Sequence, residues 1–145
     1  MQWAEHCVRH AEAYFRLLCS VSDPSELRLT AVDEVIFDKF LEMFGDIPLD
    51  VISEDSLKSG AIKSTSLPKY YVPYINKVCK WRIYCNEFEG KVEDFNLGTL
   101  FRLDASKGYC PENTCIVPRI QFLALETARN RLGINKPENL RQLHE

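Results

Sequence analysis

One segment of this chain, residues 92–132, combines three signals that leave few ways for it to fold. Apolar and polar residues first alternate in VEDFNLGTLFRLD, which is typical of a β-strand with one buried face. The turn-forming sequence ASKG follows, and a short apolar run predicts a return strand at residues 115–117. Pro118 is expected at the first position of a long helix that ends before Gly133. The segment therefore predicts a small β-hairpin joined directly to a long helix.

Apolar spacing predicts three further helices before this segment. In the first, the apolar residues recur at intervals of three and four along one face: Trp3, Cys7, Ala11, Tyr14, Leu18 and Val21. Pro24 ends this helix, because the residue before a proline disfavours the helical conformation. Thr30 and Asp33 predict a capping box at the start of the second helix, with Gly45 just past its end. The third helix is expected over residues 75–88.

Length and composition favour one globular domain. The chain has 145 residues, of which 46% are hydrophobic and 27% are charged, as in ordinary globular proteins. We therefore predict a mainly α single domain over residues 1–145: a helical bundle with a small two-stranded β-hairpin packed on the last long helix. Glycine, serine and lysine predict an exposed surface loop within residues 60–76. Residues 134–145 are expected to form a partly ordered tail with at most one short turn.

Charge and hydropathy exclude several classes of partner. The net charge of -3 does not attract nucleic acid, and Glu126 interrupts the one arginine cluster, at residues 119–131. No apolar run approaches the roughly 20 residues that a membrane span needs. The charged N-terminal residues do not resemble a signal peptide, so we interpret the 6 cysteines as reduced thiols. We expect a cytoplasmic monomer that binds neither membrane nor nucleic acid.

The sequence does not predict catalysis or metal binding. His6 and His10 have the spacing of a helical zinc-binding pair, but Cys7 falls on the apolar stripe and a third ligand would have to come from elsewhere. The third histidine, His144, is near the other terminus, so no histidine accompanies a nucleophile in the informative segment. No glycine-rich phosphate-binding loop is present. We therefore predict no catalytic residue, no metal and no cofactor, and a protein that is not an enzyme.

Charged residues of the hairpin and the last helix are the candidate site. We predict partner-binding roles for Asp94, Arg102, Asp104, Arg119 and Arg129. Arginine suits recognition because its planar guanidinium makes two hydrogen bonds to one carboxylate. The alternative is a structural ion network that ties the hairpin to the last helix. The sequence does not decide between a recognition surface and an internal network.

Four stretches together resemble one protein family: HAEAYFRLLCSV, LTAVDEVIFDKF, KWRIYCNEFEG, and EDFNLGTLFRLD followed by PRIQFLALETARNR. They are similar to the polysaccharide-biosynthesis-domain-containing family of small eukaryotic proteins. Two features depart from that family. Residues 60–76 resemble an insertion, and the long acidic tail of some relatives is missing.

The resemblance implies a mainly helical fold with a small β element. It also implies a cytosolic chaperone that attends newly made translation elongation factor 1-alpha at its GTP-binding domain, near ribosome-associated factors. Two alternatives remain open. One is an enzyme of polysaccharide biosynthesis, as the family name suggests, and the other is a small module that contacts the ribosome or RNA through the arginine cluster.

Overall fold

The computed structural model describes residues 2–59 and 80–144. The described elements follow one another along the chain in this order: α1 (Gln2–Ser20), the 3-10 helix η1 (Pro24–Glu26), α2 (Asp33–Phe44), α3 (Glu54–Ser59), α5 (Lys80–Asn86), β1 (Gly98–Arg102), the 3-10 helix η4 (Pro111–Asn113), β2 (Thr114–Pro118), α6 (Arg119–Arg131) and α7 (Pro137–His144). The prediction of a mainly helical fold with one two-stranded sheet is confirmed. The predicted loop at residues 60–76 lies outside the described residues.

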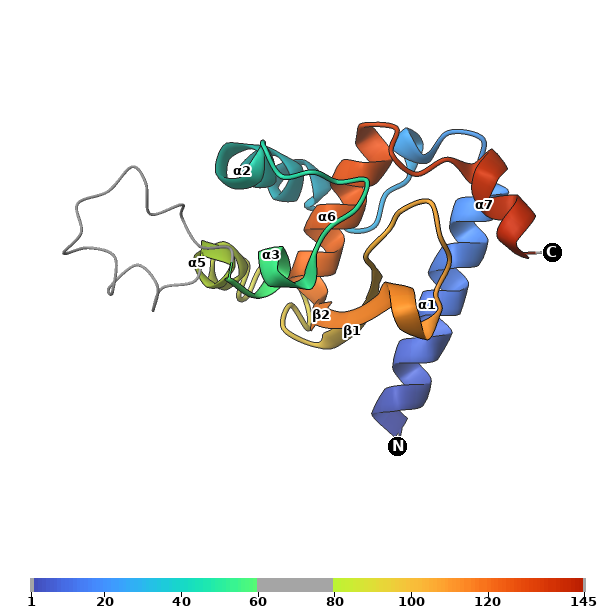
Figure 1. Ribbon diagram of the computed structural model, residues 1–145. Coiled ribbons are helices and arrows are strands. Elements are labelled where there is room, and N and C mark those ends of the chain that lie inside the picture. The colour runs from blue at the N-terminus through green and yellow to red at the C-terminus, as the bar shows by residue number, and fades with distance from the viewer. Residues whose placement is uncertain (1, 60–79, 145) are drawn as a thin grey trace.

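Helix α6 is the central element of the fold. It contacts α2, α5, η1 and both strands. Figure 1 shows α1 and α7 side by side on one side of α6, with α2, α3 and α5 on the other. Every side chain from residue 120 to residue 130 is buried, although the apolar spacing predicts only one buried face. The difference arises because elements pack around α6 from several directions, so its polar residues are enclosed with its apolar ones.

Helix α1 follows its sequence pattern closely. Cys7, Ala11, Tyr14 and Leu18 of the predicted stripe are buried, as expected. The helix ends at Ser20, and the Asp23 carboxylate then accepts hydrogen bonds from the backbone and the hydroxyl of Ser25. These bonds start the short helix η1 in place of further turns of α1.

The Asp33 side chain bonds back to Thr30 as predicted, but Thr30 is not the N-cap, because α2 begins at Asp33 and its N-cap is Val32. The Asp33 carboxylate accepts the backbone N–H of Thr30 at 2.8 Å, and the Thr30 hydroxyl accepts the N–H of Val32 at 3.2 Å. Gly45 does not adopt the left-handed conformation expected of it, since its φ is -59°. A Cβ atom there would lie 2.6 Å from the carbonyl oxygen of Leu41, and this close approach accounts for the glycine.

The predicted hairpin is present, but its first strand is shorter than the alternating segment: β1 covers Gly98–Arg102, and residues 92–97 form turns and bends. β1 pairs antiparallel with β2, with Gly98 opposite Pro118 and Arg102 opposite Thr114. Pro118 is the last strand residue and the N-cap of α6, one position before the one predicted. Gly133 follows α6 with a φ of 75°, as expected for a glycine just past a helix end.

The C-terminal residues are more ordered than the sequence suggests. Residues 137–144 form the helix α7, which packs on α1. Leu140 is buried, and the Arg141 guanidinium donates to the backbone carbonyl oxygens of Cys19 and Val21. These contacts to α1 and the loop that follows it explain why the segment does not fray.

An aromatic cluster fills the interior between α2 and α5. The Phe44 and Trp81 rings stack with their centroids 3.9 Å apart, and Phe40 lies 6.1 Å from Trp81. The Tyr84 hydroxyl donates to the carbonyl oxygen of Ile36 at 2.7 Å. No described helix is long and apolar enough to cross a membrane.

Candidate functional site

Two of the predicted site residues, Arg102 and Arg129, lie in a buried network rather than on the surface. Arg102 Nη2 lies 3.2 Å from Oε1 of Glu126, and Arg129 Nη1 lies 3.0 Å from Oε2 of the same carboxylate. Both arginines are 0% exposed, and Glu126 is 1% exposed. One carboxylate on α6 therefore joins an arginine of β1 to an arginine one turn further along its own helix.

Backbone carbonyl oxygens accept most of the other donors of the two arginines, whereas Arg102 Nε is buried without a hydrogen-bond partner among the described residues. Arg102 Nη1 donates to the carbonyls of Ala105 and Lys107. Arg129 donates to the carbonyls of Leu49, Arg102 and Leu103, at 2.8 to 2.9 Å. The two arginines thus hold together three chain segments that are far apart in sequence: the loop at Leu49, residues 102–107, and α6.

Neutral side chains complete the network. Asn135 accepts from Arg102 Nη2 at 2.9 Å and donates to Asn130 at 2.7 Å. Asn130 in turn donates to the Tyr14 hydroxyl at 3.2 Å. Burial opposes ionisation of Glu126, but the adjacent Arg102 and Arg129 outweigh it and lower the pKa of the carboxyl. Glu126 is therefore a carboxylate at neutral pH.

The network corrects the predicted roles of Arg102 and Arg129. A side chain with no exposed surface cannot contact a partner in this conformation. Of the two alternatives that the sequence leaves open, the structural network is the one that these residues form. Sequence reasoning missed Glu126 as its centre, although the spacing of three residues to Arg129 places the two side chains on the same side of a helix.

Asp94 and Arg119, by contrast, lie together at a surface hollow. We call it the histidine hollow: it has a volume of about 310 Å³, and His6, His10, Glu93, Asp94 and Arg119 are among its lining residues. Asp94 is exposed, with a left-handed φ of 54°. Arg119 Nη1 donates to the carbonyl oxygen of Glu93 at 2.6 Å. The structure therefore brings two predicted site residues together with the N-terminal histidine pair.

His10 is the more enclosed of the two histidines that line the histidine hollow. Its ring makes an edge contact with Phe122 at a centroid distance of 5.2 Å, and no described residue bonds its Nδ1 atom. Burial, together with the positive charge of Arg119 and the proximity of His6, lowers the pKa of His10 below 6.5. The described residues contain no group of three or more potential metal ligands.

Asp104 has a local role in the turn after β1. Its carboxylate accepts from the backbone N–H of Ser106 at 2.9 Å and from the Ser106 hydroxyl at 2.6 Å. The hydroxyl bond, partly opposed by burial, lowers the pKa of Asp104. Asp104 also lines a separate hollow near α7, so the structure does not bring it together with Asp94 and Arg119 in one hollow.

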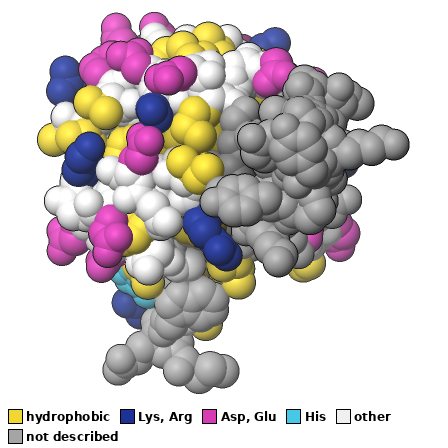
Figure 2. Space-filling model, turned by 90° about the vertical axis from the view of Figure 1, so that its left-hand side faces the viewer, with side chains coloured by type: hydrophobic (Ala, Val, Ile, Leu, Met, Phe, Trp, Pro, Cys, Tyr) yellow, Lys and Arg dark blue, Asp and Glu magenta, His cyan; other side chains and the backbone are white. Residues whose placement is uncertain are grey.

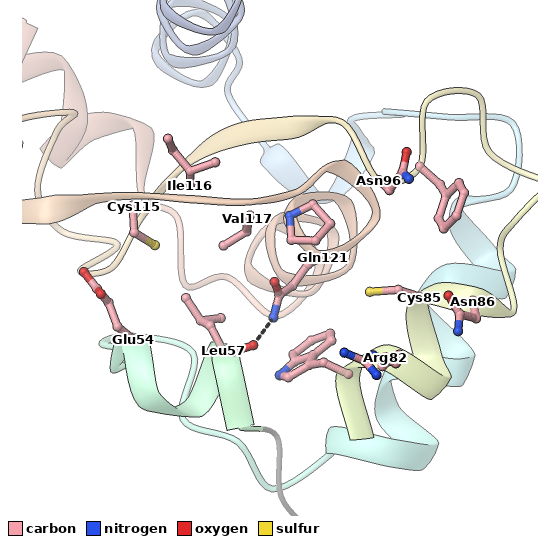
Figure 3. A pocket seen from close by; sticks show the side chains of 13 residues that line it. Glu54, Leu57, Arg82, Cys85, Asn86, Asn96, Cys115, Ile116, Val117 and Gln121 are labelled. Carbon is pink, nitrogen blue, oxygen red and sulfur yellow. Dashed lines mark hydrogen bonds between the residues drawn. The ribbon is translucent and has the colours of Figure 1, made fainter. Parts of the chain in front are cut away.

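A second surface feature has no counterpart among the predicted site residues. We call it the β2 groove: a hollow of about 430 Å³ between β2, α3 and α5, lined mostly by apolar side chains, with Glu54 and Arg82 among its residues. Figure 3 shows Cys115 and Val117 on the side of β2 that faces α3, whereas Ile116 extends from the opposite side. Gln121 Nε2 donates to the carbonyl oxygen of Leu57 across the groove at 2.9 Å.

Sequence reasoning did not identify the β2 groove, because its lining residues come from segments separated by about half the chain. Ile116 is 57% exposed, but it stands between Cys115 and Val117 in a short apolar run, so no local signal marked it as exposed. Figure 2 shows a different face, around α2 and α5, where hydrophobic side chains are interspersed with acidic and basic ones. Such mixing is usual for a protein surface.

Known proteins match almost the whole chain. The family model described as PBDC1 protein matches residues 1–140. Protein PBDC1 of Mus musculus is 47% identical over 136 residues, which are 94% of this chain and 61% of the mouse protein. Protein PBDC1 of Homo sapiens is 46% identical over 136 residues, 94% of this chain and 52% of the human protein. The chain therefore spans less than two thirds of the length of these two relatives.

Yeast proteins match more of their own length. The PBDC1 homolog of Saccharomyces cerevisiae is 38% identical over 138 residues, covering 92% of this chain and 84% of the yeast protein. A solution NMR structure of a Saccharomyces cerevisiae protein is 36% identical and superposes with a TM-score of 0.72, covering 99% of this chain and 88% of the other. The mainly helical fold therefore also occurs in an experimental structure of a similar protein.

Proposed function

Because the chain belongs to the PBDC1 family, we propose that it is a non-enzymatic protein-binding factor, a cytosolic chaperone for newly synthesised translation elongation factor 1-alpha. The client would be held at its GTP-binding domain while that domain is completed near the ribosome. The longer mouse and human relatives carry additional residues, so the proposal concerns the part that this chain represents.

The observation that carries the proposal is the β2 groove. Its floor includes Leu57, Trp81 and Val117, and its rim carries the charged groups of Glu54 and Arg82. An apolar centre with a charged rim is the usual composition of a protein-binding surface. Ile116, next to this floor, exposes more than half of its surface.

The histidine hollow supplies the proposed charged contacts. Of the five charged residues predicted from the sequence, Asp94 is exposed and Arg119 is half-buried at the rim of this hollow. We retain these two as candidate partner contacts. Arg119 begins α6 immediately after Pro118, so the histidine hollow and the β2 groove are adjacent along the chain.

An RNA-contacting role is less well supported by the fold. A basic patch in residues 119–131 would require several arginines that are available to phosphates. Arg129 is buried, Arg131 pairs with Glu34 at 2.7 Å, and Arg119 donates to a backbone carbonyl. The folded chain thus separates the arginines that lie close together in the sequence.

An enzyme of polysaccharide biosynthesis also remains to be tested. Many sugar-processing sites use a pair of carboxylates on either side of the scissile bond. Among the described residues that line the β2 groove, Glu54 is the one carboxylate. No specific feature of the groove favours a sugar over a protein segment.

A co-translational capture experiment tests the chaperone proposal. Ribosomes stalled after the complete GTP-binding domain of elongation factor 1-alpha would be incubated with tagged wild-type chain and recovered through the tag. A luciferase nascent chain of matched length is the control. We expect several-fold greater recovery of the elongation-factor complexes, and equal recovery of both nascent chains would contradict the proposed function.

Charge reversal at the histidine hollow refines the same experiment. Arg119→Glu should weaken capture by about tenfold, the effect of losing one good interfacial contact. The fold should tolerate this change, because glutamate is favourable in the first turn of a helix. Arg28→Glu, an exposed arginine before α2, is the matched control and should capture normally. If Arg119→Glu captures as well as the wild type while its thermal melt is unchanged, Arg119 is not a client contact.

A further inference from the structure

The outer edge of β2 is the edge of this strand that faces away from its partner β1. Backbone N–H of Leu103 donates to the carbonyl of Asn113 at 2.9 Å, so this pair belongs to the hydrogen-bonded positions of the ladder. In an antiparallel ladder, hydrogen-bonded pairs alternate with pairs whose backbone groups point outward. With Phe101 opposite Cys115, the groups of Thr114 and Ile116 therefore point away from β1. Pro118, which has no N–H, also falls on an outward position.

The outward backbone groups of Ile116 are unpaired within the described part of the chain. No described residue makes a backbone hydrogen bond to the N–H or the carbonyl of Ile116. The side chain of Ile116 is 57% exposed, although it stands in the middle of the strand. A strand edge with unpaired backbone groups and an exposed branched side chain is a template for another extended segment.

Hollows adjoin β2 on both faces of the sheet. On one face is the β2 groove, which Cys115 and Val117 line. On the other face is a larger hollow of about 790 Å³, which we call the α1–α7 groove, lined by Val8 of α1, Leu143 of α7, Leu100 and Thr114 among others. Leu100, which lines this second groove, lies opposite Ile116 in the ladder, so their two side chains share one face of the sheet, while Ile116 is also among the residues of the β2 groove.

We propose that the outer edge of β2 binds an extended segment of the incompletely folded client as an added antiparallel or parallel strand. The added strand would hydrogen-bond to Ile116 and Thr114. Its successive side chains would point alternately towards the β2 groove and the α1–α7 groove. This inference rests on the proposed function for the identity of the client, but the edge itself is defined by the fold.

The two-sided arrangement selects an extended occupant over other shapes. A helix presents one apolar face and has no backbone groups to offer the edge. An extended client segment has both, and it is accessible only while the client is incompletely folded. Both grooves are largely apolar. Each is lined by one acidic and one basic residue: Glu54 and Arg82 in the β2 groove, and Glu12 and Arg16 in the α1–α7 groove. They therefore suit a segment rich in apolar residues rather than a strongly charged one.

Amide hydrogen exchange measures the proposed bond directly. The probes are overlapping synthetic peptides that span the GTP-binding domain of elongation factor 1-alpha, added to the ¹⁵N-labelled wild-type chain. A binding peptide should slow exchange of the Ile116 and Thr114 amides by about tenfold or more, while amides of the exposed α2 face are unchanged. A peptide that binds without slowing these amides, or a complete absence of peptide binding, would overturn the proposal.

Edge variants supply an independent arm. Ile116→Pro removes the outward N–H, and the ladder to β1 does not use that group, so the fold should persist. Ile116→Lys keeps the N–H but places a charge that protects strand edges against pairing. Val35→Lys, on α2 and 52% exposed, is the matched control. Both Ile116 variants should lose about tenfold in peptide affinity, and Val35→Lys should bind normally.

The outcomes separate this inference from the proposed function. If wild type and Ile116 variants capture stalled elongation-factor complexes equally, the client is held elsewhere, and the edge proposal fails while the chaperone proposal stands. If the wild type captures no such complexes but its edge amides are protected by a peptide, the client assignment fails and the edge remains. If sedimentation of the chain alone shows a dimer that Ile116→Pro dissociates, the occupant is a second copy and the proposal is wrong. Should Ile116→Pro not fold, Ile116→Lys and the exchange measurement decide.

Discussion

The buried network around Glu126 and the exposed surface around β2 use similar residues in opposite ways. In the network, the carboxylate lies between two guanidinium groups, and carbonyl oxygens accept most of the other donors. At the surface, the Arg119 guanidinium donates to the carbonyl of Glu93, and the backbone of Ile116 bonds to no described backbone group outside the ladder. The two regions differ in burial. A buried charge must be paired inside the protein, whereas an exposed group is solvated by water and remains free to bind a partner.

Removing the central carboxylate should produce the largest effect on stability. Glu126→Gln would leave two buried arginines around a neutral amide, and the free energy of unfolding should fall by about 3–5 kcal/mol. Urea denaturation followed by circular dichroism measures this change. Glu34→Gln, which removes the partner of the more exposed Arg131, is the matched control and should change stability little. Comparable losses in both variants would mean that burial does not distinguish the two pairs.

A conservative change within the network should cost less. Arg129→Lys keeps the charge but cannot reproduce hydrogen bonds to three carbonyls and a carboxylate from one planar group. We expect a loss of about 2 kcal/mol in the free energy of unfolding, since buried carbonyls are left without donors. Arg131→Lys is the control, with a smaller loss expected. Wild-type stability of Arg129→Lys would show that charge alone sustains the network.

Protonation of His10 should lower the free energy of unfolding, because the folded chain holds this partly buried ring in its neutral form. Its pKa in the folded chain is below 6.5, so the unfolded chain binds the proton first as the pH falls. Stability due to neutral His10 is therefore complete above the unfolded pKa and decreases through the interval down to the folded pKa. Denaturation at a series of pH values should show this decrease in the wild type as the pH falls below about 6.5.

The matched variants for that series are His10→Gln and His6→Gln. His10→Gln should flatten the dependence of stability on pH, whereas His6→Gln should leave most of it in place, because the His6 side chain is exposed. An unchanged slope in His10→Gln would assign the pH dependence to other groups.

The smallest effect is expected at Asp94. Its φ of 54° is a conformation that glycine adopts without a steric cost. Asp94→Gly should therefore raise the free energy of unfolding by about 0.5 kcal/mol, whereas Asp94→Ala should lower it. Chemical denaturation distinguishes the two directions. If Asp94→Gly also lowers client capture, the Asp94 carboxylate belongs to the binding surface.

Local patterns predicted the secondary structure well where the chain determines it locally. The apolar stripe of α1, the hydrogen bond between Thr30 and Asp33, the paired hairpin strands and Gly133 are all present. Each depends on residues within one or two turns. The helix α7 was underestimated, because its order depends on Leu140 and Arg141 contacting α1, more than a hundred residues away in the sequence.

The candidate site was predicted less well, for a related reason. The sequence predicted that the charged residues must be paired or must meet a partner, and the structure shows the pairing of Arg102 and Arg129. The sequence could not assign each residue to one of these roles, because Arg102 and Arg119 differ in burial and not in chemistry. Ile116 was counted only as part of a return strand, and its exposure depends on what packs beside β2.

The sequence by itself determined the periodicity, and with it the helices, the hairpin and the family to which the chain belongs. It also determined that charged residues would lie close to core positions. Only the tertiary structure decided which charges are enclosed and which strand edge stays open. The physical reason is that periodicity is a property of neighbouring residues, whereas burial depends on every element that packs around a position: five of them surround α6, and none of the described ones covers the outer edge of β2.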